Sequence, residues 1–236
     1  NAKILHSVRL GASTTIGNYV LPKLLWQLAQ NQPETLVWNT EVSILNTADI
    51  CQQVAQFELD IGLIEGPCLD PMLHVQPWRS DEMVVVVSPV HPVAALVAQG
   101  LRPDVHSLQA ATWLLREQGS GTRKACEEYF QQKRVHFAAA QEVSSLEALR
   151  ECVVAGLGIA LLPRHAVGLE LAAGLLKELP VEELPLYRTW CAVHARGKRL
   201  SPVAQAFLDF IRTERAQISA LSERFAGRAP EQDSGS

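Results

Sequence analysis

The chain has 236 residues, of which 47% are hydrophobic and 19% charged, the proportions of an ordinary soluble globular protein. Its 21 basic and 25 acidic residues give a net charge of −4, which argues against a chain that grips nucleic acid by itself, because phosphate neutralisation needs a basic face. No apolar run approaches the roughly 18 residues of a membrane span, so we expect no membrane attachment.

The first part of the chain alternates between strand and helix patterns. Residues 8–12 predict a strand, and Leu21, Leu24, Leu25 and Leu28 have the spacing of one helix face. The pattern continues with a strand at 35–44, an N-cap region at 46–49 that opens a helix, a short buried strand at 60–64 and two extended stretches within 73–88.

The same alternation then starts again. It predicts a helix over 91–100, a strand at 111–116, a helix through 130, a strand at 137–143, a helix from 146, a strand at 159–162, a helix at 165–173, a strand at 189–195 and a last helix from 203. Residues 227–236 are polar and contain Gly and Pro, so we expect a disordered tail. Strands that alternate with helices in two similar series predict an α/β protein of two lobes with mainly parallel sheets.

Four predicted turns carry most of the chemical information, because each joins a strand to a helix with hydroxyl, amide or glycine residues. In a parallel sheet such turns meet at the carboxyl edge of the strands, where open α/β folds bind ligands. Helix N-termini offer free N–H groups, so the turns could cradle a small anion without Lys or Arg. Equally, Ser, Thr and Asn are simply the preferred helix caps. The turns lie at residues 13–15, 46–47, 119–122 and 144–145.

The sequence holds no catalytic or metal-binding constellation. Ser120 lacks the G-x-S-x-G elbow, and the 119–122 turn lacks the Walker spacing. The seven histidines show no H-E-x-x-H spacing, and Asp81-Glu82 reads as an edge or turn pair. We therefore expect no enzyme, no cofactor and no metal.

The five cysteines are odd in number and widely spaced without a C-x-x-C, which favours the reducing cytoplasm over an exported disulfide scaffold. Cys68 could be an exposed thiol or a half-buried apolar side chain. The chain begins at Asn1 without an initiator Met or a signal pattern, so we expect a mature exported protein or a piece of something longer.

Taken in order, several segments resemble the effector-binding domain of LysR-type transcriptional regulators over residues 8–211. Each segment is weak alone, but their combination is specific. They are Val-Arg-Leu-Gly-Ala-Ser (8–13), Leu-Asp-Ile-Gly-Leu-Ile-Glu-Gly (59–66), Gly-Ser-Gly-Thr-Arg (119–123) and Ala-Gly-Leu-Gly-Ile-Ala-Leu-Leu-Pro (155–163).

The resemblance implies two Rossmann-like lobes with an effector cleft, as in periplasmic binding proteins. The first lobe would hold residues 1–87 plus 189–226 and the second residues 88–188, with hinges near Ser88 and near Tyr187-Arg188. The family's DNA-reading winged helix-turn-helix is absent from these residues, so DNA binding would belong to a longer parent protein. The resemblance also implies a homodimer, pairing the helix at 21–30 and the strand from Thr35 with the helix at 146–154.

The resemblance also points to residues that would contact the effector, with Arg9 and Arg123 as more distant helpers. We expect a small anion or carboxylate held by Ser13, Thr14, Thr15, Ser88, Ser120 and Thr122. The resulting hypothesis is a cytoplasmic, small-molecule-sensing domain of a transcription regulator. The alternative is the solute-binding protein of a transporter, which has the same two-lobed fold.

Overall fold

The computed structural model describes residues 4–30 and 36–213. A helix covers residues 202–213 after the last labelled element. In chain order the labelled elements are β1 (Ile4–Ser13), α1 (Thr14–Tyr19), α2 (Leu21–Gln30), β2 (Leu36–Leu45), α3 (Thr47–Ala55), β3 (Ile61–Glu65), β4 (Leu73–Val87), α4 (Ala94–Ala98), a 3₁₀ turn (His106–Leu108), β5 (Thr112–Leu115), α5 (Gly121–Lys133), β6 (Ala139–Glu142), α6 (Leu146–Val154), β7 (Ile159–Pro163), α7 (Arg164–Ala172), β8 (Lys177–Leu179) and β9 (Leu186–Ala195).

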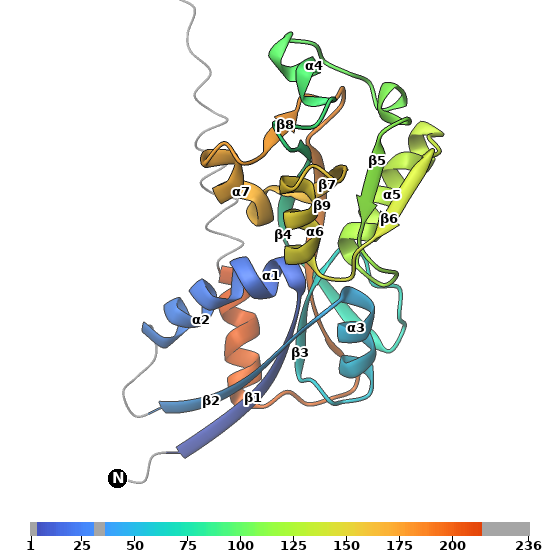
Figure 1. Cartoon of the computed structure of the whole chain (residues 1–236). Coiled ribbons are helices and arrows are strands. Elements are labelled where there is room, and N and C mark those ends of the chain that lie inside the picture. The colour runs from blue at the N-terminus through green and yellow to red at the C-terminus, as the bar shows by residue number, and fades with distance from the viewer. Residues whose placement is uncertain (1–3, 31–35, 214–236) are drawn as a thin grey trace, which may run out of the picture.

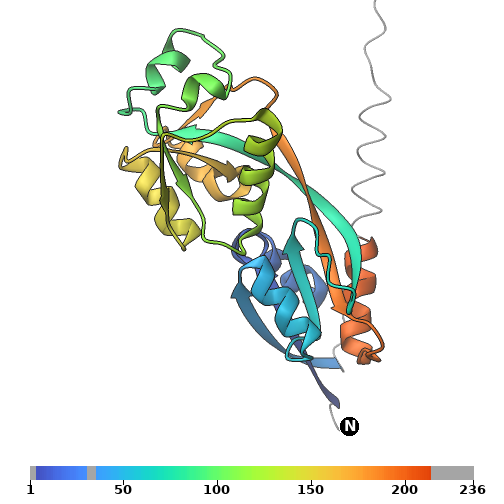
Figure 2. The same cartoon turned by 90° about the vertical axis from the view of Figure 1, so that its right-hand side faces the viewer.

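The strands form one continuous sheet that spans two lobes. The order is β2-β1-β3-β9-β4-β7-β5-β6, with β8 also paired to β4. The long strands β4 and β9 run from one lobe into the other, as Figure 2 shows in the side view. They pair antiparallel with their neighbours, whereas β1, β2 and β3 in one lobe and β5, β6 and β7 in the other pair parallel. The predicted two-lobed α/β fold is therefore confirmed, in a sheet that is mixed rather than mainly parallel.

The first lobe contains β1, β2, β3 and the adjoining parts of β4 and β9, with helices on both faces (Figure 1). On one face α1, α2 and the helix at 202–213 bury Ile16, Leu24 and Phe207 against the sheet. On the other face α3 buries Ile50 and Val54. Leu21, Leu24 and Leu28 are buried at the spacing that predicted their helix.

The second lobe repeats this arrangement around β7, β5, β6 and β8. Trp113 and Phe130 pack edge to face under α5 on one side, with ring centroids 4.8 Å apart. Leu146, Leu149 and Val153 of α6 pack with α7 on the other side. Both cores form because apolar residues recur about every 3.6 residues along the helices, which gives each helix one apolar face. These faces pack on short strands that are buried along their whole length.

The strand β4 has different partners along its length. Residues from Leu73 to Met83 pair with β9, while Met83–Val87 pair with β7. Asp81 faces Arg188 across this pairing, and the hinges expected near Ser88 and near Tyr187-Arg188 stay predictions. The lobe limits expected after residues 87 and 188 stay predictions. The tail at 227–236 and the stretch beyond residue 213 lie outside the described residues.

Candidate functional site

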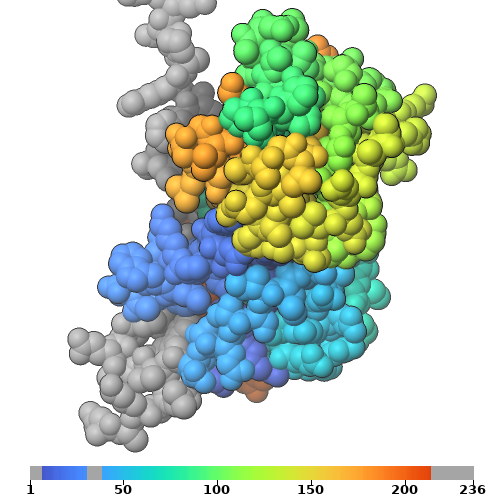
Figure 3. Space-filling view, viewed as in Figure 1, coloured from blue at the N-terminus to red at the C-terminus, as the bar shows by residue number. Residues whose placement is uncertain are grey.

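The four predicted turns meet at the boundary between the lobes. The Ala48 N–H donates to the Gly119 carbonyl at 3.1 Å. Asn18, near the first turn, donates to Glu147, just after the fourth. Figure 3 shows the lobes in direct contact along this boundary. The approach is closest at Gly121, where an added Cβ would lie 2.3 Å from the Glu65 carbonyl oxygen, so only glycine fits.

A buried ion cluster lies behind this boundary. The Oε2 atom of Glu65, at the end of β3, accepts from Nη1 of Arg188 in β9 at 2.8 Å. The same guanidinium donates through Nε to Asp81 Oδ1 of β4 at 3.1 Å, with a second bond through Nη2. None of the three side chains is more than 4% exposed. Such a cluster persists only when hydrogen bonds and opposite charge compensate desolvation.

The pKa values of the two carboxylates in the cluster are shifted in opposite directions. Burial favours the neutral acid, but the charge of Arg188 and the hydrogen bond from the Thr15 backbone N–H hold the pKa of Glu65 below its usual value. Burial raises the pKa of Asp81, because Arg188 does not fully compensate it and Glu65 adds repulsion. Glu65 is therefore the anion that the surrounding donors stabilise best.

The first predicted turn surrounds this anion. The Thr15 backbone N–H donates to Glu65 Oε1 at 2.7 Å. The Thr122 hydroxyl lies 3.5 Å from Glu65 Oε2 and accepts from Arg188 Nη1 at 3.2 Å. The hydroxyls of Ser13 and Thr15 are buried beside the same carboxylate without a well-formed hydrogen bond among the described residues. The place assigned to an external anion thus holds the chain's own carboxylate.

The capping interpretation is correct for three of the turns. Ser120 Oγ accepts from the Arg123 N–H at 3.3 Å, and Ser145 Oγ accepts from Ala148 N–H at 3.2 Å. Asn46 caps α3 in the same way. Ser13 precedes α1, but its side chain makes no cap hydrogen bond. Ser120 therefore caps α5 near the site, whereas the Ser13 side chain does not cap α1.

Two of the expected contacts lie apart from the cluster. The Thr14 hydroxyl is half-buried and accepts from Arg116 Nη2 at 3.5 Å. Ser88 follows the end of β4, about 20 Å of extended strand beyond Asp81, and its hydroxyl donates to the Val154 carbonyl. The structure therefore does not bring Ser88 to the others, because β4 runs on past Asp81 along β7 and ends at Val87.

The two arginines expected as helpers are also engaged elsewhere. Arg9 forms an ion pair with Asp60 at 2.9 Å. Arg123 pairs with Glu127 at 2.6 Å and donates to the Arg116 carbonyl. Neither of them reaches Glu65.

The residues of the ion cluster were missed by the sequence reasoning. Asp81, expected in an edge or turn pair, lies within β4 and is fully buried, so that expectation is wrong. Glu65 directly follows four apolar or glycine residues of a strand that is buried at every position. A carboxylate at the end of such a strand needs a buried partner, and that signal could have marked it.

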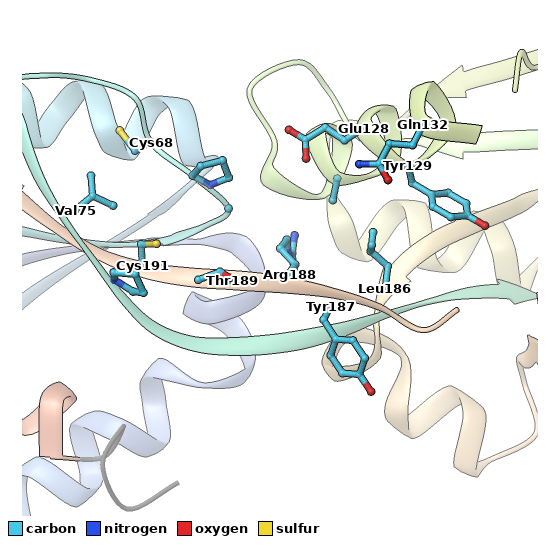
Figure 4. Close-up of a pocket in the computed structure, with 14 residues that line it drawn as sticks. Cys68, Val75, Glu128, Tyr129, Gln132, Leu186, Tyr187, Arg188, Thr189 and Cys191 are labelled. Atoms are coloured by element: carbon cyan, nitrogen blue, oxygen red, sulfur yellow. The ribbon is translucent and has the colours of Figure 1, made fainter. Parts of the chain in front are cut away.

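Two pockets flank α5 next to the cluster, and both have the size of ligand sites. One, of about 410 Å³, lies between the N-termini of α3 and α5 and is lined by Thr47, Glu65, Ser120 and Gly121. The other, of about 510 Å³, lies between α5 and the long strands (Figure 4) and is lined by Tyr129, Arg188 and Cys191. Glu65 and Arg188 each line one of them, so small molecules can approach the cluster from both sides.

Neither a metal site nor a membrane span is found within residues 4–30 and 36–213. There, no group of three His, Cys, Asp or Glu residues could hold a metal ion. No helix within those ranges is long and apolar enough to cross a bilayer.

Comparison with known proteins gives a consistent picture. Residues 4–216 match the family model described as the LysR substrate binding domain. The chain is 37% identical over 204 residues to the uncharacterized HTH-type transcriptional regulator YeiE of Escherichia coli K12, covering 86% of this chain and 67% of that protein. It is 32% identical over 200 residues to the HTH-type transcriptional activator CmpR of Synechocystis, covering 85% and 64%. The chain thus spans about two thirds of these relatives.

The chain is also similar to solved structures of regulatory domains. The regulatory domain of CcmR from Synechocystis, in complex with 2-PG, is 28% identical with a TM-score of 0.77, covering 89% of this chain and 97% of that one. The effector binding domain of QuiR in complex with shikimate, 20% identical, has a TM-score of 0.78 over 90% and 98%. The second likeness concerns the fold alone.

Proposed function

Since this chain belongs to the family of LysR substrate-binding domains, we propose that it senses a small anionic metabolite at the boundary between its two lobes. The anion takes the donors that now hold the Glu65 carboxylate. These are the Thr15 N–H, the Thr122 hydroxyl and the Arg188 guanidinium, with Ser13 and Thr15 adding hydroxyl donors.

The observation that carries the proposal is this donor set around a buried carboxylate. Amide, hydroxyl and guanidinium groups from β9, α5 and the β1–α1 turn converge on Glu65 within 2.7–3.5 Å. Charge-assisted bonds of this kind suit any oxyanion of similar size. Two buried hydroxyls without well-formed bonds are donors that a ligand oxygen can use.

Relatives favour this function over that of a transporter's solute-binding protein. YeiE and CmpR are both transcription regulators, and the solved structure of the CcmR regulatory domain is a complex with 2-PG. Transcription regulators are not enzymes, and we propose that this chain is not one either. DNA binding then belongs to a separate part of the parent protein, which acts in the cytoplasm. The two lobes move about a hinge where β4 and β9 pass between them.

The same domain is proposed to form a homodimer through α2 and β2. β2 is an edge strand of the described sheet, paired with β1 alone. Val42 and Ile44 on β2 and Trp26 on α2 leave large apolar surfaces exposed. Both elements lie on one flank of the first lobe (Figure 1). Exposed apolar side chains on a strand whose outer edge has no neighbour in the described sheet are typical of a surface that a second chain covers.

Calorimetric titration tests the anion site. The wild-type chain and the Glu65→Gln variant are titrated with inorganic phosphate, sulfate, acetate and 2-PG. We expect at least one anion to bind the wild type, and the variant to bind it at least about tenfold more tightly, because the competing carboxylate is gone. Absence of binding to both proteins, or weaker binding to the variant, would overturn the proposal.

A further inference from the structure

We propose that the pocket between α5 and the long strands β4 and β9 is a second ligand site, which binds an apolar organic amine in its cationic form. Its volume of about 510 Å³ is that of a small-molecule site. It is distinct from the pocket between α3 and α5, which Thr47 and Glu65 line. The site therefore goes beyond the anion sensor and takes a ligand of the opposite charge.

One wall of this pocket is a single face of α5. Ala125, Glu128, Tyr129 and Gln132 line it, and their spacing of three and four residues places them on one side of the helix. Ala125 and Tyr129 are buried, whereas Glu128 and Gln132 are exposed. Figure 4 shows Glu128 and Gln132 on the α5 side of the pocket. This wall is therefore apolar in its depth and polar at its mouth.

The opposite wall is mostly apolar and comes from the long strands. Val75 and Pro77 of β4 and Leu186 of β9 line it, together with Pro67 of the segment after β3. Figure 4 shows Val75 and Leu186 at opposite ends of this wall. Apolar side chains on both walls favour a ligand whose body is itself apolar, because its binding removes apolar surface from water.

The charges of the pocket select the sign of the ligand. Of the described residues, two with charged side chains line it, Arg188 and Glu128. The guanidinium of Arg188 is already bonded to Glu65 and Asp81, and neither of these carboxylates lines this pocket. An anion that enters here therefore finds no carboxylate to displace and no free positive charge.

The carboxylate of Glu128 is the charge that remains for a ligand. Within residues 4–30 and 36–213 it forms no ion pair or hydrogen bond. An ammonium group beside it gains a charge-assisted hydrogen bond. Gln132 lies one turn further along the same helix face, and its side-chain oxygen accepts a second N–H of the ammonium. A cation at the mouth and an apolar body in the depth together describe an organic amine.

Three probes with the same indole ring test the charge selection on the wild-type chain. Tryptamine, tryptophol and indole-3-acetate are cationic, neutral and anionic at neutral pH, and NMR titration of the amide signals measures the dissociation constant of each. We expect tryptamine to bind at least about threefold more tightly than tryptophol and indole-3-acetate to bind most weakly, with the largest shifts in α5 and at residues 186–189. Equal affinities, tighter binding of indole-3-acetate, or no shift with any probe would overturn the proposal.

A pair of charge variants tests the role of Glu128. Glu128→Gln should weaken tryptamine binding by about threefold to fivefold, the range of a partly exposed ion pair, and leave tryptophol binding unchanged. Glu151→Gln makes the same change of charge at an exposed carboxylate of α6 in the second lobe, so it should leave both unchanged. An equal loss of tryptamine affinity in the two variants would contradict a contact with Glu128.

A second pair of variants locates the ligand. Gln132→Trp fills the mouth of the pocket with a ring and should abolish the binding of tryptamine and tryptophol. Gln131→Trp places the same ring at the neighbouring exposed position of α5, outside the pocket lining, and should not. Equal effects at the two positions would rule out this pocket. Tryptamine and the anions enter different pockets, so a chain that fails to bind phosphate, sulfate or 2-PG should still bind tryptamine.

Discussion

Glu65 Oε2 lies 2.8 Å from Arg188 Nη1, and the two side chains are only 3% and 4% exposed. Glu65 ends a strand of the first lobe, and Arg188 lies where β9 passes between the lobes. Arg188 also holds Asp81 of β4, so one guanidinium ties three strands together. Any anion that replaces Glu65 therefore acts on the place where the lobes are joined.

Removal of this guanidinium should destabilise the chain strongly. Arg188→Met leaves Glu65 and Asp81 buried without an opposite charge, and should lower the free energy of unfolding by about 3–5 kcal/mol. Arg212→Met is the control, because the Arg212–Asp209 pair is about half exposed. Its loss should cost less than about 1 kcal/mol. Urea denaturation measures both, and similar losses in the two variants would contradict the cluster's importance.

Serine substitutions should separate the capping turns from the anion site. Ser120→Ala and Ser145→Ala remove side-chain caps and should each lower the free energy of unfolding by about 1 kcal/mol. Ser13→Ala removes no cap hydrogen bond, so its unfolding curve should stay close to that of the wild type. If Ser13→Ala lowers the free energy of unfolding as much as Ser145→Ala does, Ser13 is a helix cap after all.

Much of the fold can be predicted from the sequence, because apolar residues recur at the regular spacing of helices and strands. The buried leucines of α2 and the alternating series of strands and helices predict both lobes. The six-residue helix α1 was missed, since Ser13-Thr14-Thr15 reads as a turn and the helix is too short to show a period. The long strand β4 was expected as two stretches, because Pro77 and the bulge beside it interrupt the pattern.

The site was predicted only in part, for a physical reason. The turn residues Ser13, Thr15, Ser120 and Thr122 follow from strand-to-helix order, which is local. The partnership of Glu65 with Arg188 joins positions far apart in the chain, and depends on the antiparallel register of β3, β4 and β9. Nothing in the local pattern around Arg188 specifies that register.

Acid should destabilise the chain partly through Asp60. Burial alone would raise its pKa, but hydrogen bonds from Arg9 and Lys198 lower the pKa of Asp60 to about 2. The folded pKa is thus below the unfolded value of about 3.9, so this contribution is full above pH 4 and is lost as pH falls toward 2.

The contribution amounts to about 2 kcal/mol. The difference between wild type and Asp60→Asn in unfolding free energy should therefore shrink over that range. A difference that stays constant from pH 6 to pH 2.5 would contradict the low pKa.

The proposed dimer should depend on the exposed flank of the first lobe. Val42→Glu places a charge on the edge strand β2 and should turn a dimer into a monomer at micromolar concentration, because a buried unpaired carboxylate is costly. Val90→Glu is the control, since Val90 is also exposed but lies in the second lobe beyond β4. Light scattering measures both, and a wild type that is already monomeric would count against the pairing.

Calorimetric titration of Ser13→Ala and Ser88→Ala with the anion that binds the wild type most tightly is the most direct measurement of the central claim. Both serines are buried, but only Ser13 lies beside the Glu65 carboxylate. Loss of one charge-assisted bond should weaken binding to Ser13→Ala by about tenfold to a hundredfold, and Ser88→Ala should bind as the wild type does. Unchanged affinity in Ser13→Ala, or an equal loss in Ser88→Ala, would contradict an anion site around Glu65.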